Sequence, residues 1–206
     1  MFLLSCSGLY GAQSLAAVKV DLGDKGEEVI ELAERLSNFS EIPNPTYGWM
    51  GYGGGSPKDC VLDGNWKLRF TSGADATFPD SPTRGKATTS QVVNATEGTL
   101  TNSIDFEKGK VKGFRVVVEG TALSDTEMDL KFKKVIIHRE SRFPRLLGCI
   151  TVLIPSFKYL SALARFASRG KAKSTGPGFQ LRYVDQNLRM HKTRDGIWFI
   201  QTRMNE

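Results

Sequence analysis

The sequence has few cysteines, few histidines and no long apolar run. Its 206 residues include three cysteines, Cys6, Cys60 and Cys149, and two histidines, His138 and His191. An odd number of widely spaced cysteines predicts neither a disulfide framework nor a zinc site, although a bridge between Cys60 and Cys149 stays open. We expect neither a bound metal nor a cofactor.

The motifs of common catalytic sites are also missing. The sequence has neither a Gly-x-Ser-x-Gly elbow nor a His-Glu-x-x-His motif. The glycine-rich run from Gly51 to Ser56 lacks the Gly-Lys-Ser/Thr ending of a phosphate loop. No recognition helix, ribonucleoprotein motif or zinc module accompanies the positive charge, so we expect no nucleic-acid partner. The sequence favours a protein that is not an enzyme.

The first segment, residues 1–23, has no charge as far as Val18. Polar residues interrupt its apolar stretches, so it is too short and too polar to predict a membrane span. Small residues between Ser14 and Ala17 are typical of a targeting leader, whereas the missing basic start favours a disordered or truncated leader. Both interpretations stay open.

Residues 24–58 form a second segment with two parts. Apolar residues recur at helical spacing from Val29 to Leu36, which predicts an amphipathic helix that begins near Asp24. This helix either packs on the main domain or binds a partner. From Ile42 to Lys58 the prolines and glycines predict a flexible linker that exposes Trp49 and Tyr52.

The rest of the chain, residues 59–206, repeats the two-residue alternation of half-buried strands. The opening strand begins after the turn Asp63-Gly64, with Trp66 and Leu68 on one face and Lys67 on the other. Similar segments follow at short spacing, with turns such as Lys108-Gly109 between them. About eight such strands predict an antiparallel β-barrel or sandwich.

One face of these strands is strongly apolar and supplies candidates for a ligand-binding lumen. They are Trp66, Leu68, Phe70, Asn102, Ile104, Phe106, Phe114, Met128, Leu130, Phe132 and Tyr183. An eight-stranded barrel either fills with such side chains or holds one small ligand. Asn102 is the polar exception, so its amide should bond either a neighbouring strand or a ligand head group.

The positive charge is concentrated before the last strands. The net charge is +6, yet the stretch from His138 to Lys173 alone has eight basic residues and one acidic residue. Its mixture of basic and apolar residues suits an anionic membrane surface, with candidates Arg165, Arg169, Lys171 and Lys173. The alternative is a partly helical insertion, residues 138–176, that caps the barrel with a solvated basic rim.

Two motifs resemble those of the plastid lipid-associated proteins, also called fibrillins. The opening motif of that family, Leu-x-Gly-x-Trp-x-Leu-x-Phe/Tyr-Thr-Ser, is matched by residues 62–72. Its closing motif, Tyr-x-Asp-x-x-Leu-Arg, is matched by residues 183–189, followed by a glycine turn and a last apolar strand. Lys192 and Thr193 depart from the usual arginine and glycine. The resemblance covers roughly Cys60 to Arg203.

The resemblance implies a single lipocalin-like (calycin-type) β-barrel that binds isoprenoid or other hydrophobic lipids without enzymatic activity. It also implies a plastid (chloroplast) protein that associates with thylakoid or plastoglobule surfaces, so that its partners are a lipid ligand and an anionic membrane or lipid-droplet surface. The alternative function is a structural coat protein with a solid core and a basic membrane-binding surface.

Asp185 and Arg189 lie on either side of a tight turn in the closing motif. A carboxylate there can accept hydrogen bonds from turn amides, and an arginine can bridge carbonyls or pair with the carboxylate. We interpret both residues as structural and not as catalytic.

Overall fold

The computed structural model describes residues 24–73, 81–140, 148–153 and 177–204. The predicted leader, residues 1–23, lies outside them, as do the membrane-surface candidates Arg165, Arg169, Lys171 and Lys173. None of the helices in the described ranges is long and apolar enough to cross a membrane. The predicted function of the basic insertion therefore stays a prediction.

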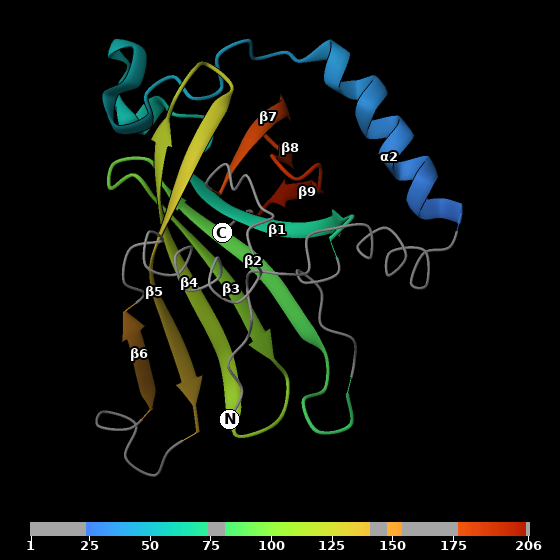
Figure 1. The fold of residues 1–206 in the computed structure, drawn as a ribbon, viewed down its shortest axis with the longest axis vertical. Helices are drawn as coiled ribbons and strands as arrows, with labels where there is room; N and C mark the ends of the chain where they lie inside the picture. Colours follow the sequence, from blue (N-terminus) through green and yellow to red (C-terminus); the bar gives the residue numbers. More distant parts are fainter. Residues whose placement is uncertain (1–23, 74–80, 141–147, 154–176, 205–206) are drawn as a thin grey trace, which may run out of the picture.

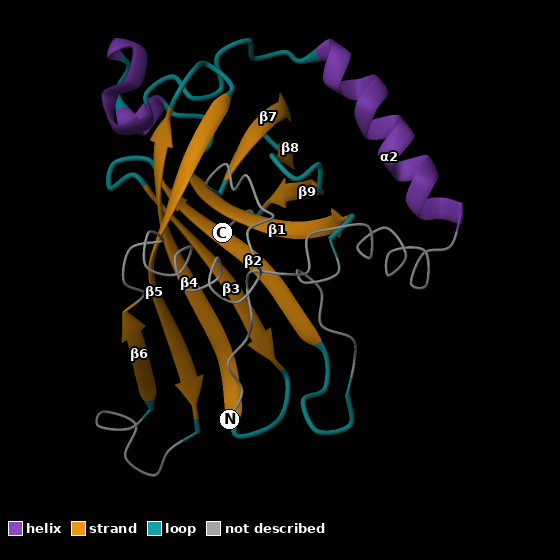
Figure 2. Cartoon of the chain, in the orientation of Figure 1, coloured by secondary structure: helices purple, strands orange, loops and turns teal. Residues whose placement is uncertain are grey.

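The described residues form one α-helix, three short 3₁₀ segments and nine strands (Figure 2). The helix and 3₁₀ segments are α2 (Asp24–Leu36), η1 (Ser37–Phe39), η2 (Trp49–Gly54) and η3 (Pro57–Asp59). The strands are β1 (Gly64–Thr71), β2 (Ala87–Asn94), β3 (Thr99–Phe106), β4 (Val111–Ala122), β5 (Glu127–Arg139), β6 (Cys149–Leu153), β7 (Gly178–Val184), β8 (Leu188–Thr193) and β9 (Trp198–Arg203).

All strand pairings are antiparallel and join the nine strands into one sheet that closes into a ring. The order is β4-β3-β2-β1-β9-β8-β7-β5-β6, and β4 also pairs with β5. The prediction of a mainly β, antiparallel fold with an amino-terminal amphipathic helix is confirmed. The sequence analysis missed β6, which lies inside the predicted insertion.

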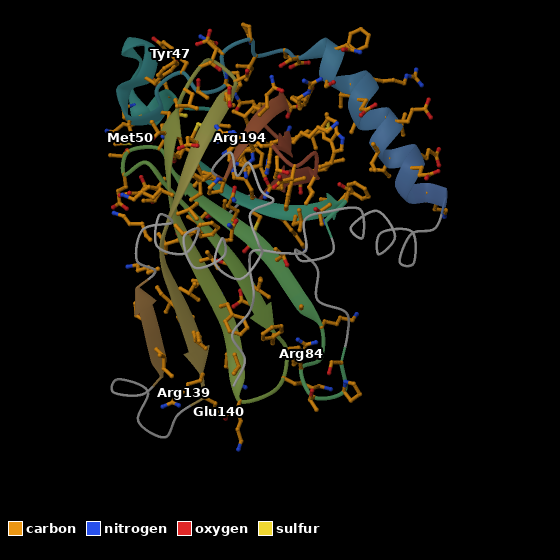
Figure 3. All side chains as sticks on the ribbon, viewed as in Figure 1. Tyr47, Met50, Arg84, Arg139, Glu140 and Arg194 are labelled. Carbon is orange, nitrogen blue, oxygen red and sulfur yellow. The ribbon has the colours of Figure 1, made fainter. Side chains whose placement is uncertain are left out.

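The ring closes at only one end of β5. There, residues 127–129 pair with β7, whereas residues 134–138 pair with β6. Arg194, labelled in Figure 3, links the β8–β9 turn to this closed end by donating to Asp129 at 2.8 Å and Glu127 at 3.1 Å. At the other end, β2 to β5 extend well beyond β7, β8 and β9 (Figure 1).

Residues 44–62 fold against the closed end, where the sequence analysis predicted an exposed linker. Trp49 is only 2% exposed, and its indole Nε1 donates to the Gly120 carbonyl at 3.0 Å. A Cβ on Gly120 would lie 2.9 Å from Trp49, so only glycine leaves room for the indole. Tyr52 is partly buried against the same core. The prediction of exposure was wrong because glycines allow a compact turn as readily as a flexible one.

Two β-bulges reverse the side-chain alternation of the opening and closing motifs. The register shifts between Leu68 and Phe70 in β1 and between Leu181 and Tyr183 in β7. Phe70 and Tyr183 therefore lie on the outer face of the ring and not on the inner face that the alternation predicted. An inserted residue turns every later side chain to the opposite face, which the two-residue pattern cannot reveal.

Helix α2 covers this outer face. Its Ala33 is 3% exposed and packs in one buried cluster with Phe70, Tyr183, Met190 and Trp198. The helix thus packs on the main sheet, as the first of the two interpretations predicted. Because it packs over Phe70, Tyr183, Met190 and Trp198 from outside, β1 and β7–β9 are buried on both faces at these residues.

Candidate ligand-binding site

The inner face of the ring changes character along its length. At the closed end it is a packed core in which Trp66 and Met128 are 0% exposed and Leu100 is 1% exposed. Beyond this core, five apolar residues of β3, β4 and β5 are only half-buried. We call them the inner apolar patch: Ile104, Phe114, Val116, Val135 and Ile137.

A polar cluster lies next to this patch, centred on Arg189 of β8. The Arg189 side chain is 1% exposed. Its Nε donates to Gln201 Oε1 at 3.0 Å, and its Nη2 donates to both Gln201 and Gln91. Gln91 Nε2 in turn donates to Asn102 Oδ1 at 2.6 Å. We call Gln91, Asn102, Arg189 and Gln201 the arginine–amide cluster.

Strand register explains why residues so far apart in sequence meet. Gln91 lies directly opposite both Trp66 and Asn102, and Gln201 lies opposite Leu68 and Arg189. Directly opposed residues point to the same face. Four strands therefore bring amides and a guanidinium together inside the ring.

Trp66 lies between two guanidinium groups. Arg189 is 4.7 Å from its ring centroid and Arg203 is 4.3 Å from a centroid of the same indole. Arg203 donates to the backbone carbonyls of Val61, Asp63 and Gln186, each at 2.6 Å. The indole attracts both cations through its π-electrons, while the carbonyls also stabilise Arg203.

Arg189 differs from Arg203 in having no nearby acid. Among the described residues, no carboxylate forms an ion pair with Arg189. Burial, together with the charge of Arg203, lowers the pKa of Arg189 to about 9. Even this pKa lies above neutral pH, so the cluster has a positive charge in the interior.

His191, two residues beyond Arg189 on β8, is the second buried basic group. Its ring lies 4.5 Å from Phe179 and 5.0 Å from Phe199, centroid to centroid. Its Nδ1 has no hydrogen-bond partner among the described residues. Burial and the nearby charge of Arg189 lower the pKa of His191 well below its ordinary value. The imidazole is therefore neutral at neutral pH.

The remaining candidates from the sequence occupy the inner face at different depths. Trp66 and Met128 belong to the packed core, and Leu130 and Phe132 pack partly buried against it. Asn102 bonds Gln91 and Leu68 lies opposite Gln201, both of the arginine–amide cluster, while Ile104 and Phe114 belong to the inner apolar patch. Phe106 contacts Phe114 edge to face at 5.7 Å. Only Phe70 and Tyr183 of the predicted set lie outside the ring.

Asp185 holds the β7–β8 turn. Its Oδ1 accepts hydrogen bonds from the backbone N–H groups of Asn187 and Leu188, both at 2.6 Å, and its Oδ2 accepts one from the Tyr183 hydroxyl. Burial would raise the pKa of Asp185, but these hydrogen bonds lower it below its ordinary value. The Arg189 side chain makes neither of the two contacts predicted for it, with carbonyls of the turn or with Asp185, because it enters the ring and bonds Gln91 and Gln201.

The two free cysteines of the described residues lie in different environments. Cys60 is buried in the core of the closed end, and Cys149 is exposed on β6. The bridge that the sequence left open is therefore absent. Within the described ranges, no group of three His, Cys, Asp or Glu side chains has metal-binding geometry.

Two shallow grooves lie on the surface, and Gln91 of the arginine–amide cluster is one of the residues that line the second. One of about 220 Å³ lies between β7 and the segment after α2, lined by Pro43 and Tyr183. The other, of about 270 Å³, is lined mainly by outer-face residues of β2, β3 and β4, including Arg115. Neither is lined by a residue of the inner apolar patch.

Sequence reasoning missed Gln91, Gln201 and His191 as members of the interior. Gln201 and His191 each lie two residues from another inward position on the same strand. The two-residue alternation could therefore have predicted that both point inward. Glutamine and histidine resemble surface residues when the outer cover by α2 is unknown.

Comparison with protein families settles the relationship of this chain. The PAP_fibrillin family model matches residues 22–202. The chain belongs to the PAP_fibrillin family. The match also includes α2 and the residues that cover the closed end, which the predicted resemblance from Cys60 onward left out. The PAP_fibrillin family is in general associated with plastids. No curated protein and no solved structure matches the chain.

Proposed function

We propose that this PAP_fibrillin protein binds a hydrophobic lipid on the inner face of a lipocalin-like ring and carries it at plastid membranes. The ligand is an isoprenoid or another plastid lipid, and the membrane is a thylakoid or plastoglobule surface. No bond-making chemistry is involved. The proposal rests on family membership together with one structural observation.

That observation is the inner apolar patch. Ile104 faces Phe114, which faces Ile137, and all three remain partly exposed, whereas the neighbouring core at the closed end is fully packed. Contiguous exposed apolar surface is costly in water, at about 25 cal/mol per Å², and commonly marks a binding site. A lipid chain on this surface would remove it from water.

Lipid co-purification tests the proposal. Lipids extracted from gently purified protein would be identified by mass spectrometry. Ile104→Arg places a cation on the patch, and Val117→Arg places the same cation on the outer face of β4, where Val117 lies opposite Thr101. We expect Ile104→Arg to lose about tenfold of the bound lipid and Val117→Arg to keep it. A folded Ile104→Arg variant with its full lipid content would contradict the proposal.

The second candidate function is a structural coat protein whose surface acts and whose ring is solid. The packed closed end favours it, because Trp49, Trp66 and Met128 leave no room there. This candidate predicts that no lipid co-purifies with the wild-type protein, while the protein still binds membranes.

Membrane attachment is a separate part of the proposal and depends on the basic insertion. Each basic group near an anionic surface contributes about 1 kcal/mol. Changing Arg165, Arg169, Lys171 and Lys173 to glutamate should weaken binding to vesicles of galactolipid mixed with an anionic lipid by more than about tenfold, and salt should weaken wild-type binding. Co-sedimentation measures both effects. Binding indifferent to charge reversal and to salt would leave the insertion as a cap.

A further inference from the structure

We propose that the arginine–amide cluster binds the anionic head group of a single-chain lipid whose hydrocarbon tail lies along the inner apolar patch. The inference rests on the proposed function and names its ligand class. The shared chemistry is an anionic oxygen group, either a carboxylate or a phosphate monoester, on one hydrocarbon chain.

Among the described residues, Arg189 lacks the countercharge that a buried cation ordinarily has. A buried cation is ordinarily paired with an acid, because removing an isolated charge from water is costly. The more exposed arginines follow this rule: Arg115 donates to Asp105 at 2.7 Å, and Arg194 donates to Asp129 at 2.8 Å. Arg189 is more deeply buried than either, yet its described partners are neutral amides and an indole. A bound anion would supply the missing countercharge.

The hydrogen bonds within the arginine–amide cluster run in one direction. Gln91 accepts from Arg189 with its oxygen and donates to Asn102 with its nitrogen. This order uses the oxygen of Asn102 and leaves its Nδ2 without a described partner. Arg189 Nη1 likewise donates to no described residue. The cluster therefore presents unused donors, which suit an anion with several acceptor oxygens.

The arginine–amide cluster lies next to the inner apolar patch. Asn102 lies opposite Val116 and two residues from Ile104 on the same face of β3. Asn102, Val116 and Ile104 are all half-buried. The donors of the cluster thus lie where the packed core meets the inner apolar patch. An amphiphile with its head at Asn102 and Arg189 would place its tail on Val116, Ile104 and Phe114.

The decisive measurement compares lipids that differ only in the head group. Oleate, oleyl phosphate and oleyl alcohol, delivered from cyclodextrin, would be titrated into the full chain while the fluorescence of Trp66 and the other indoles is recorded. We expect both anions to bind at least about tenfold more tightly than the alcohol, since a charge-assisted hydrogen bond to a buried group is roughly this strong. The ratio between the two anions then assigns the head group.

Two variants locate the anion. Arg189→Gln removes the charge, so the anions and the alcohol should then bind about equally tightly. Gln91→Glu instead puts a permanent carboxylate beside Arg189, so it should also remove the preference while raising the melting temperature by about 3 °C. Gln91→Glu keeps the test decisive if Arg189→Gln fails to fold. Arg69→Gln, an exposed site on β1 that loses the same charge, is the control and should keep the wild-type preference.

The outcomes separate this inference from the proposed function. Equal binding of the alcohol and the anions by the wild-type protein would overturn the inference and leave lipid binding intact. A preference that persists in Gln91→Glu would overturn it as well. Failure of all three lipids to bind would overturn the inference, and the co-purification experiment would then test the proposed function separately.

Discussion

Strands β4 and β8 place their arginines on opposite faces of the sheet. In β3 and β4, Ile104 and Phe114 point inward, whereas Asp105 and Arg115 pair on the outside. In β8 the arrangement is reversed, because Arg189 points inward and Met190 points outward beneath α2. The helix covers the outer face of β8, so both faces of this strand are buried.

This difference shows what a helix on the outside of a sheet changes. When the outer face is already dry, the inner face no longer needs to carry the apolar residues. Polar side chains inside are tolerated if they bond one another, as Arg189, Gln91 and Gln201 do. The half without a helix keeps the ordinary pattern and leaves the inner apolar patch for a ligand.

A charge placed on the outer face should have very different effects on stability beneath α2 and where no helix covers the sheet. Met190→Lys buries an unpaired cation beneath α2, where Met190 is 2% exposed, and should lower the free energy of unfolding by more than about 3 kcal/mol. Val92→Lys on the outer face of β2, where Val92 is 45% exposed, should change it by less than about 0.5 kcal/mol. Urea unfolding measures both. Equally small effects would mean that α2 does not cover β8.

Loss of the Asp185 carboxylate should have the next largest effect, because this residue holds the turn that sets the β7–β8 pairing. Asp185→Ala removes the acceptor of two backbone N–H groups and one hydroxyl and should lower the free energy of unfolding by about 2 kcal/mol. Asp195→Ala in the exposed β8–β9 turn is the matched control and should have little effect. The wild-type contribution should also fade as pH falls below 3.8, because the pKa of Asp185 is lowered on folding.

Protonation of His191 in the interior should have a smaller effect on stability, which appears at acidic pH. The pKa of His191 is lowered on folding from its ordinary 6.5, so the unfolded chain binds the proton first and stability falls as pH drops below that value. Between pH 6.5 and 5.5 the loss should be about 1 kcal/mol. His191→Phe keeps an aromatic ring between Phe179 and Phe199 and should reduce this loss, whereas His138→Gln should retain it. Chemical unfolding at several pH values would show whether the slope follows His191.

The two described cysteines should differ in reactivity, because one lies in the closed end of the ring and the other on β6. This difference can be measured without changing stability. Cys149 is exposed on β6, whereas Cys60 is 4% exposed and burial raises the pKa of its thiol. Iodoacetamide should therefore label Cys149 in the native protein and Cys60 only after denaturant is added. Peptide mass spectrometry resolves the sites. Native labelling of Cys60 at a similar rate would show that the closed end opens readily.

Several features could be read from local sequence. The alternation predicted β1 to β5 and β7 to β9, and the turn residues Lys108-Gly109 predicted the β3–β4 connection, where Gly109 has a φ of 94°. The hydrogen bonds that the Asp185 carboxylate accepts could be predicted from its place before a tight turn. The amide of Asn102 bonds a neighbouring strand, one of the two partners expected for it.

Other features could not be read from it. Trp49 and the glycines around it gave no sign that they pack on Gly120, since the two are distant in sequence. The short β6 was hidden in a basic segment. The inward position of Arg189 was missed because an arginine beside a turn resembles a surface residue.

The sequence by itself determined the strands and turns, because side-chain alternation and glycine conformations are local properties of a few neighbouring residues. Tertiary structure alone decided which face of each strand is interior. Two bulges moved Phe70 and Tyr183 outward, and the cover supplied by α2 let Arg189 turn inward. Such choices depend on contacts between distant segments, and their free energy is settled only when both faces of the sheet are covered.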